Sequence, residues 1–230
     1  MKIAYTGLPL SEGKVKYNDP ILIDLDKTFA PKKFTPYFFE FTSGDLERCD
    51  VIATSREKVL DVLIPDMEKL ETRLERSDNE LEKATARKAL SYLEKEIPLY
   101  SAEFTEQEKE IIRKLTPVTL KPVVIYDAMP DDMTKFFEIL LDKSGYVFFY
   151  TAGKQEVHAW LARKDADIVT CAGKIHSDLA RGFIRADVIN YKEFKGLHNL
   201  NEAREKGLMR EEGKEYLIKY GDIIEIKFSA

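Results

Sequence analysis

The chain has 230 residues, of which 44% are hydrophobic and 33% charged, and its formal net charge is -5. This composition is typical of an ordinary soluble protein with one large or two small folded domains. No stretch approaches the roughly 18 apolar residues of a membrane span, and the start MKIAYTGLPL turns polar too early for a signal peptide. We therefore expect a cytoplasmic protein with no membrane partner.

The acidic charge is unevenly distributed along the chain. Residues 1–145 carry 22 basic and 28 acidic side chains, whereas residues 146–230 carry 14 and 13. The C-terminal part is therefore the better candidate for contact with phosphate groups. Cys49 and Cys171 have no Cys or His close by in sequence, so we expect buried free thiols and no metal site.

The N-terminal part alternates short apolar runs with helical patterns. These patterns predict strands near residues 2–6, 21–25, 37–42, 50–54 and 122–126. Asn18-Asp19-Pro20 indicates a turn before the second of these strands. Thr105-Glu106-Gln107-Glu108 is a capping box that opens a helix to about Leu115, and residues 133–144 form a short amphipathic helix.

Residues 56–97 have the most regular pattern. Apolar residues recur at spacings of three and four, at Leu60, Leu63, Met67, Leu70 and Leu74. This is the pattern of a coiled-coil helix, which Pro65 is expected to kink or restart. Ser77-Asp78-Asn79-Glu80 then predicts a second capped helix, whose facing apolar residues are Ala86, Leu90, Leu93 and Ile97. We expect an antiparallel helical hairpin with a charged outer face, which is either solvated surface or a docking arm for a protein partner.

The C-terminal part predicts a sheet around one helix. Alternation at Val157, Ala159 and Leu161 favours a half-buried strand. The apolar spacing from Ala172 to Leu179 indicates a helix that ends at a left-handed Gly182. Gly221-Asp222 is a turn signal between the apolar runs 216–218 and 223–226, which together predict a terminal hairpin.

Three blocks of the C-terminal part resemble the TGS domain of YchF-type proteins, a branch of the Obg-like P-loop NTPases. The blocks are FYTAGKQEVHAW, CAGKIHSDLARGFIRADVI and EGKEYLIKYGDIIEIKF. The resemblance implies an α/β protein with a ubiquitin-like β-grasp (TGS) domain at residues 146–230. It also implies a pared-down P-loop GTPase-like domain at residues 1–145, into which the helical hairpin is inserted.

The nucleotide motifs of that family are degraded in this chain. Between Gly7 and Gly13-Lys14 lie five residues instead of four, and Val15 replaces the hydroxyl residue that would hold Mg²⁺. No carboxylate precedes Gly44 where a D-x-x-G motif would have one, and Ala128 or Met129 stands where base recognition would need Asn. Phosphoryl transfer depends on positioning and on Mg²⁺, so we expect a protein that is not an enzyme and has no cofactor.

The function that follows from these residues is binding. Seven residues form a candidate basic face for RNA: Lys154, His158, Arg163, Lys174, His176, Arg181 and Arg185. The resemblance implies the ribosome or structured RNA as the partner. The two histidines can also be surface or helix-cap residues, and Lys174 can pair with Asp178 four residues on. The alternative function is a regulator that retains weak binding or hydrolysis of ATP or GTP with Mg²⁺ through an atypical phosphate loop formed by Gly7, Gly13 and Lys14.

Overall fold

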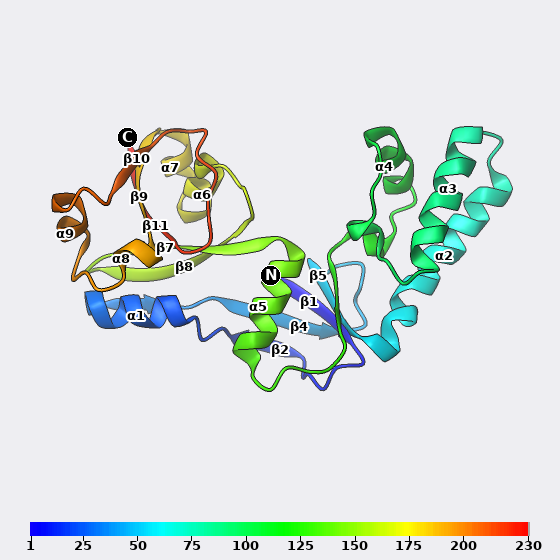
Figure 1. Cartoon of the computed structure of the whole chain (residues 1–230), viewed down its shortest axis with the longest axis horizontal. Helices are drawn as coiled ribbons and strands as arrows, with labels where there is room; N and C mark the ends of the chain where they lie inside the picture. Colours follow the sequence, from blue (N-terminus) through cyan, green and yellow to red (C-terminus); the bar gives the residue numbers. More distant parts are fainter. Residues whose placement is uncertain (230) are drawn as a thin grey trace. The chain divides into compact units, whose positions relative to one another are not determined.

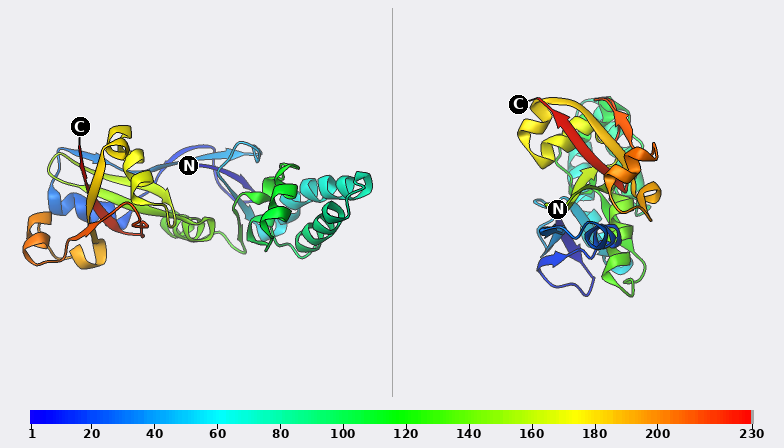
Figure 2. Two further views of the ribbon diagram at one scale, coloured as in Figure 1. Left: turned by 90° about the horizontal axis from the view of Figure 1, so that it is seen from above. Right: turned by 90° about the vertical axis from the view of Figure 1, so that its left-hand side faces the viewer.

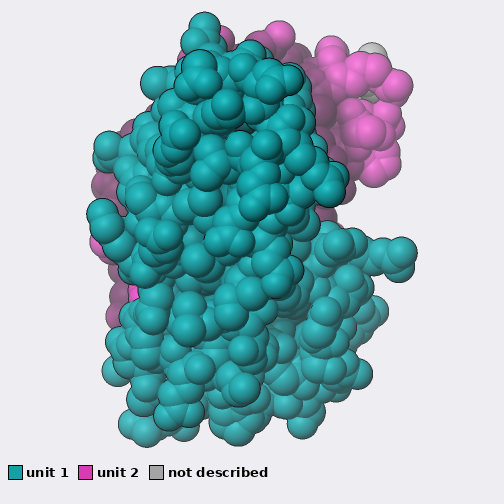
Figure 3. Space-filling view, turned by 90° about the vertical axis from the view of Figure 1, so that its right-hand side faces the viewer, with its two compact units in different colours: residues 1–15, 39–136 teal, residues 16–38, 137–230 magenta. Residues whose placement is uncertain are grey.

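The computed structural model describes residues 1–229, which form two compact units. Unit 1 comprises residues 1–15 and 39–136, and unit 2 comprises residues 16–38 and the chain from residue 137 onward (Figure 3). A segment from the N-terminal part of the chain therefore belongs to the C-terminal unit. The domain division expected from the sequence, at residue 145, assigns that segment to the N-terminal domain instead.

Unit 1 is built on a five-stranded sheet with the order β2-β4-β1-β5-β6. Its strands are β1 (Lys2–Thr6), β2 (Gly13–Lys16), β4 (Phe38–Ser43), β5 (Val51–Ser55) and β6 (Val123–Tyr126). Strand β1 pairs in parallel with β4 and β5, and β5 pairs in parallel with β6. The strands expected near residues 2–6, 37–42, 50–54 and 122–126 are confirmed.

Two helices between β5 and β6 lie side by side (Figures 1 and 2). After a short 3-10 turn, η1 (Arg56–Lys58), helix α2 (Val59–Arg76) is followed by α3 (Glu80–Leu93). Leu63 and Leu70 of α2 and Leu90 of α3 belong to one buried cluster, which holds the two helices together.

Three details of this pair differ from the sequence-based expectation. Helix α2 continues through Pro65 without a break, although that proline has no N–H to donate. Leu60 is 46% exposed and lies outside the apolar seam, because Val59 takes its place beside the predicted residues Leu63 and Leu70. The N-cap of α3 is Asn79, which accepts from two backbone N–H groups, whereas the Ser77 hydroxyl donates to Glu82.

The remaining helices of unit 1 include one that the sequence predicts well. Helix α4 (Glu106–Arg113) opens with the expected capping box, in which the Thr105 side chain accepts from the backbone of Glu108 and Glu108 accepts from the backbone of Thr105. The short 3-10 turns η2 (Leu99–Ser101) and η3 (Val118–Leu120) flank it. The expected amphipathic helix is α5 (Met133–Ser144), within which unit 1 gives way to unit 2.

Unit 2 is built on a six-stranded sheet with the order β10-β9-β11-β7-β8-β3. Its strands are β3 (Lys33–Thr35), β7 (Tyr146–Ala152), β8 (Glu156–Arg163), β9 (Phe183–Asn190), β10 (Arg210–Glu212) and β11 (Asp222–Phe228). The β7–β8 pair is antiparallel, as are the pairs that β9 forms with β10 and β11. Strand β11 pairs in parallel with β7 and β3 pairs in parallel with β8, so the sheet is mixed.

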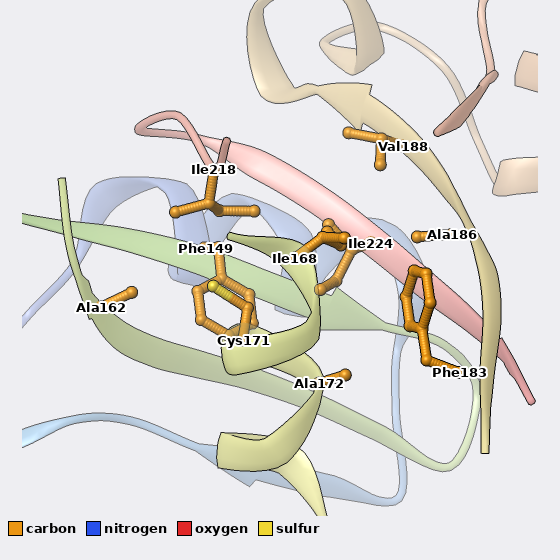
Figure 4. Close-up of a cluster of buried hydrophobic side chains, with 10 residues drawn as sticks. All are labelled: Phe149, Ala162, Ile168, Cys171, Ala172, Phe183, Ala186, Val188, Ile218 and Ile224. Atoms are coloured by element: carbon orange, nitrogen blue, oxygen red, sulfur yellow. The ribbon is translucent and has the colours of Figure 1, made fainter. Parts of the chain in front are cut away.

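One face of this sheet is covered by α6 (Ile168–Ile175) and α7 (Ser177–Arg181). Figure 4 shows Phe149 of β7, Ile224 of β11 and Cys171 of α6 directed into one buried cluster between helix and sheet. Burial in this cluster raises the pKa of the Cys171 thiol to about 12.

The prediction of a single helix from Ala172 to Leu179 is wrong. His176 interrupts it with a φ of -163°, an extended conformation. Gly182 is not left-handed either, since its φ is -94°. A Cβ at Gly182 would lie 2.0 Å from the backbone oxygen of Ser229, so close backbone approach is what requires glycine there.

The strand expected at residues 21–25 is also wrong, because α1 (Pro20–Phe29) is a helix. Its buried residues are Ile21, Leu22, Leu25 and Phe29, a spacing that fits one helical face. Asp19 is the N-cap rather than part of a free turn, and Pro20 occupies the first helical turn, where proline has no N–H bond to lose.

Helix α1 covers the second face of the six-stranded sheet, next to β7 and β8 (Figure 1). The Tyr17 ring stacks on Phe148 of β7 with 5.4 Å between ring centroids. The buried Tyr150 hydroxyl donates to Asp19 over 2.6 Å. The sheet of unit 2 is therefore buried on both faces, and residues 16–38 supply one of the two covering layers.

The prediction of a terminal hairpin is wrong as well. Residues 216–218 form only an isolated bridge, between Leu217 and Asp167. Strand β11 lies in the middle of the sheet between β7 and β9, so its partners come from earlier in the chain. The turn itself is present, since Gly221 has a φ of 86°. Helices α8 (Tyr191–Phe194) and α9 (Leu200–Glu205) complete unit 2.

Candidate functional site

The carboxyl ends of the parallel strands of unit 1 meet at one edge of the sheet. Open α/β sheets bind ligands at this edge. A hollow of about 400 Å³ lies there, and its walls include Gly7 after β1, Ser43 and Gly44 at the end of β4, and Asp61 of α2. This hollow is the first candidate site.

Neighbouring protein atoms explain why position 7 is a glycine. Its φ is 66°, and a Cβ would lie 2.3 Å from the Ser55 hydroxyl oxygen and 2.5 Å from Cγ of Lys58. Glycine is therefore required because the end of β5 approaches the loop closely. The side chains of Ser55 and Lys58 pack where the loop would have to receive a ligand.

The loop after Gly7 leads into a strand. Gly13 and Lys14 belong to β2 and are exposed, and neither lines the hollow. A phosphate loop works because its N–H groups converge at the start of a helix that follows directly. The next helix in this chain begins only at Pro20, in unit 2. Of the three remnant residues named from the sequence, the structure places Gly7 alone at the hollow.

The charged groups at this edge are already paired with one another. Lys58 lies 3.3 Å from Asp61, and Arg56 donates to Asp127 over 3.0 Å and to Glu96 over 3.4 Å. Both cations that follow β5 therefore neutralise protein carboxylates.

Glu12 adds a further negative charge beside β4. Its carboxylate accepts from the backbone N–H of Ser43 over 2.8 Å and from the Ser43 hydroxyl, and these hydrogen bonds hold the pKa of Glu12 below its ordinary value. Asp45, which follows Gly44, pairs instead with Lys2 over 3.1 Å. The edge thus presents carboxylates where a polyphosphate would need cations.

The sequence reasoning did not single out Glu12, Ser55, Arg56 or Asp127. A usable signal was present for Arg56 and Asp127, because each follows directly after a predicted parallel strand. Glu12 could not be found in this way, since its partner Ser43 is 31 residues away.

Three of the seven basic candidates in unit 2 make internal contacts. The Lys154 ammonium donates to the backbone oxygen of Phe29 at the end of α1, over 3.0 Å. The Arg163 guanidinium lies 4.1 Å from the ring centroid of Tyr146. The His158 ring stacks on Trp160 at 3.6 Å, and burial lowers the pKa of His158. These three side chains stabilise the unit itself.

Three other candidates lie together on α6 and α7. Lys174 is exposed on α6, and His176 caps α7 by accepting from the backbone N–H of Asp178 over 3.2 Å. The helix-cap interpretation of His176 is confirmed. Asp178 pairs with Arg181 rather than with Lys174, so the expected i,i+4 pair is wrong because the chain breaks at His176 between them.

Arg185 points away from this group. It alternates on β9 with Ala186, whose side chain belongs to the cluster under α6, so Arg185 projects from the opposite face of the sheet. There it lies 3.0 Å from Glu211 of β10. The seven candidates therefore do not share one face, and the exposed basic group on the helical side consists of Lys174, His176 and Arg181.

Within residues 1–229, no group of three or more His, Cys, Asp or Glu side chains is arranged to hold a metal ion. Both cysteines are buried, as expected. In the same part of the chain, no helix combines the length and the apolar character needed to cross a membrane.

Known proteins resemble this chain in both sequence and fold. Residues 146–229 match the family YchF-GTPase_C, described as "Protein of unknown function (DUF933)". The "Ribosome-binding ATPase YchF" of Mycoplasma genitalium is 47% identical over 81 residues, which are 35% of this chain and 22% of that protein. The protein of the same name from Bacillus subtilis is 28% identical over 253 residues, covering 81% of this chain and 68% of the relative.

A solved structure of the Schizosaccharomyces pombe YchF GTPase has a similar fold. Its TM-score is 0.77 at 18% identity, and the superposition covers 99% of this chain and 97% of that one. The alignment to the Bacillus subtilis relative is longer than the 230 residues of this chain, yet it includes only 81% of them. That relative therefore has residues inside the aligned region that this chain lacks.

Proposed function

The chain belongs to the YchF-type family, and on that premise we propose that it is a non-catalytic binding protein whose partner is the ribosome or another structured RNA. In this proposal unit 1 is a pared-down P-loop GTPase-like domain with an inserted helical hairpin. The C-terminal part is a TGS domain. The two bacterial relatives are named ribosome-binding proteins, and the partner is carried over from them as part of the proposal.

The strand order of unit 2 supports the TGS assignment. Leaving out β3, the order β8-β7-β11-β9-β10 places the last strand between the first hairpin and the later strands. Helix α6 connects β8 to β9 across one face. A β-grasp domain has the same strand order, and the family match over residues 146–229 covers these strands, so both observations support the proposed assignment.

The non-catalytic part of the proposal rests on the course of the loop after β1. It enters strand β2, so the loop is not followed directly by a helix whose N-terminus could receive phosphate. Arg56 and Lys58, the cations nearest the strand ends, are held by carboxylates. Phosphoryl transfer needs positioned cations and Mg²⁺, and these contacts provide neither.

The hollow beside Gly7 is the one feature that favours the alternative, a regulator that binds ATP or GTP with Mg²⁺ through an atypical loop. Its position at the carboxyl edge suits a nucleotide. Its chemistry does not, because Lys58 is neutralised by Asp61, which lines the hollow, and Glu12 adds a carboxylate beside Ser43. We therefore place binding of RNA first.

The cations of α6 and α7 support an RNA partner. The Arg181 side chain is 81% exposed, and Lys174 is exposed one helix earlier. Contacts between such cations and phosphate release counterions, so the resulting affinity falls steeply with salt. Asp178 neutralises part of the charge of this group. Lys174 is the member of the group that has no carboxylate partner among residues 1–229.

Co-sedimentation with ribosomes tests the proposal. The double variant Lys174→Glu/Arg181→Glu should abolish binding that the unmodified protein shows at low salt, and that binding should weaken as salt rises. The double variant Lys192→Glu/Lys195→Glu changes the charge equally near α8 and is the matched control. Arg185→Glu, which acts on the opposite face of the sheet, should leave binding in place. Equal loss in the two double variants would mean that only net charge matters, and undiminished binding by Lys174→Glu/Arg181→Glu would refute this site.

A further inference from the structure

A second pocket lies wholly within unit 2 and takes no part in the proposed function. Its volume is about 450 Å³. Its walls come from four separate segments: the chain before α1, the end of α5 with the start of β7, the turn after β8 and the turn before β11. The sequence alone does not reveal the pocket, because these segments are far apart along the chain.

The floor and one wall of this pocket are aromatic and aliphatic. Tyr17, Tyr146 and Tyr220 line it together with Leu141 and Val147. Tyr17 is only 2% exposed, whereas Tyr220 is 48% exposed and presents its ring at the opening. The face of a tyrosine ring attracts cations. Tyr146 already shows this behaviour, since the Arg163 guanidinium lies 4.1 Å from its ring centroid.

Three carboxylates also line the pocket, those of Glu138 and Asp142 on α5 and that of Asp165 after β8. Glu138 and Asp142 are four residues apart, so they project from the same face of the helix. Among residues 1–229, neither Glu138 nor Asp142 forms an ion pair with a basic side chain. Two carboxylates without a cationic partner therefore line the same pocket as Tyr220, and the charge of Glu138 acts on the Tyr220 hydroxyl.

Carboxylate charge acts on two of the aromatic residues. Burial first, and then the charges of Asp19 and Glu138, raise the pKa of Tyr220 to about 12. The same carboxylates add to the burial that raises the pKa of Tyr17. Lys164 and Lys219 also line the pocket and are exposed, as Glu138 and Asp142 are, and the Lys219 ammonium lies 5.8 Å from the ring centroid of Tyr216.

We infer that this pocket binds a small organic cation, in which a protonated amine faces Glu138 and Asp142 and an apolar body rests on Tyr220 and Leu141. An anion would have to approach both carboxylates, and a neutral apolar molecule would leave them without a partner. This ligand site is separate from the proposed RNA contact, so the two proposals are tested independently.

Three probes that share one ring and differ in charge test the inference. Benzylamine is a cation at pH 7, benzyl alcohol is neutral and benzoate is an anion, and isothermal calorimetry on the full chain compares them. We expect saturable binding of benzylamine, at least tenfold weaker binding of the alcohol and no binding of benzoate. A tenfold difference corresponds to about 1.4 kcal/mol.

The variants locate the site. Glu138→Gln/Asp142→Asn should weaken benzylamine binding at least tenfold, and Tyr220→Ala should weaken it as well. The matched control is Glu71→Gln/Glu75→Gln, which removes two exposed carboxylates four residues apart on α2. All of these side chains except the Tyr220 ring are exposed polar groups, so folding is checked by the unfolding midpoint of each variant.

Several results would overturn the inference. Equal binding of benzyl alcohol would mean that the pocket has no charge preference, and tighter binding of benzoate would mean that Lys164 and Lys219 decide its specificity. The same loss in Glu71→Gln/Glu75→Gln would reduce the effect to net charge. Absence of benzylamine binding to the folded protein at millimolar concentration would also overturn it.

Discussion

The hydrogen bond from Tyr150 to Asp19 joins the α1 segment to the sheet of unit 2, and its removal tests that arrangement directly. The hydroxyl donates over 2.6 Å, and the two residues are 131 positions apart in sequence. Asp19 is 1% exposed and also accepts from the backbone N–H groups of Ile21 and Leu22 at the start of α1. One carboxylate therefore both caps the helix and receives the buried hydroxyl.

The expected losses follow from these contacts. Asp19→Ala removes the helix cap, which costs about 1 kcal/mol, and leaves the Tyr150 hydroxyl buried without its acceptor, which costs about 1–3 kcal/mol more. Tyr150→Phe removes only the donor and should cost about 1–2 kcal/mol. Because the two variants share one hydrogen bond, the double variant should be less destabilised than the sum by at least about 1 kcal/mol.

Urea unfolding of the four proteins measures this coupling. The fluorescence of Trp160 is a suitable signal, since the residue lies on β8 in the same unit. Tyr92→Phe is a control with little expected effect, because the Tyr92 ring contacts Phe104 while its hydroxyl has no hydrogen-bond partner among residues 1–229. A coupling below about 0.3 kcal/mol would equal simple additivity and would refute the docking of α1 described above.

Two further predictions follow from the same residues and from the loop after β1. Because burial raises the pKa of Asp19, the folded state binds its proton more tightly than the unfolded state, so the free energy of unfolding should fall as pH rises from about 4 through the native pKa. Asp19→Asn should remove that dependence in urea titrations at a series of pH values, and an unchanged slope would contradict it. A titration with fluorescent ATP and GTP analogues in the presence of Mg²⁺, with an intact YchF-type protein as control, should show no saturable binding up to about millimolar nucleotide, a free energy of about 4 kcal/mol. Micromolar binding would instead favour the nucleotide-regulated alternative.

Local patterns in the sequence predicted local structure well. The capping box at Thr105–Glu108 and the amphipathic helix at residues 133–144 depend on neighbours within four positions, and both are present. The strands of unit 1 were predictable for a similar reason, since continuous apolar runs mark buried parallel strands. Such patterns hold wherever the nearest residues along the chain decide the conformation.

Predictions failed where distant residues decide the conformation. Ile21-Leu22-Ile23 is typical of a strand when taken alone, yet it is helical and packs against β7 and β8, which come much later in the chain. Helix α7 does end at Gly182, but a left-handed conformation is not the reason for glycine there, because the distant backbone of Ser229 is what excludes a side chain. Tertiary contact overrides a short apolar run more easily than a long one.

The sequence predicted which types of residue to examine at the candidate sites, but it did not predict where the fold places each of them. Sequence motifs correctly directed attention to Gly7, which lines the hollow, but could not reveal that Gly13 and Lys14 lie on a strand outside it. The basic residues of unit 2 were chosen by charge alone. Alternation along β9 puts Arg185 on the face opposite α6, which only the register of the sheet reveals.

The segment that follows the loop after β1 contributes to the stability of unit 2. In a P-loop protein the chain after the phosphate loop forms the helix that supports the phosphates. Here residues 16–38 supply Tyr17 and Asp19, which contact Phe148 and Tyr150 of β7, and strand β3, which pairs with β8. Without this segment the strands of residues 146–229 would expose that apolar face to water, at a cost of roughly 25 cal/mol per Å² of apolar area. The chain after the loop therefore serves the fold of unit 2 and supplies no helix directly behind the loop.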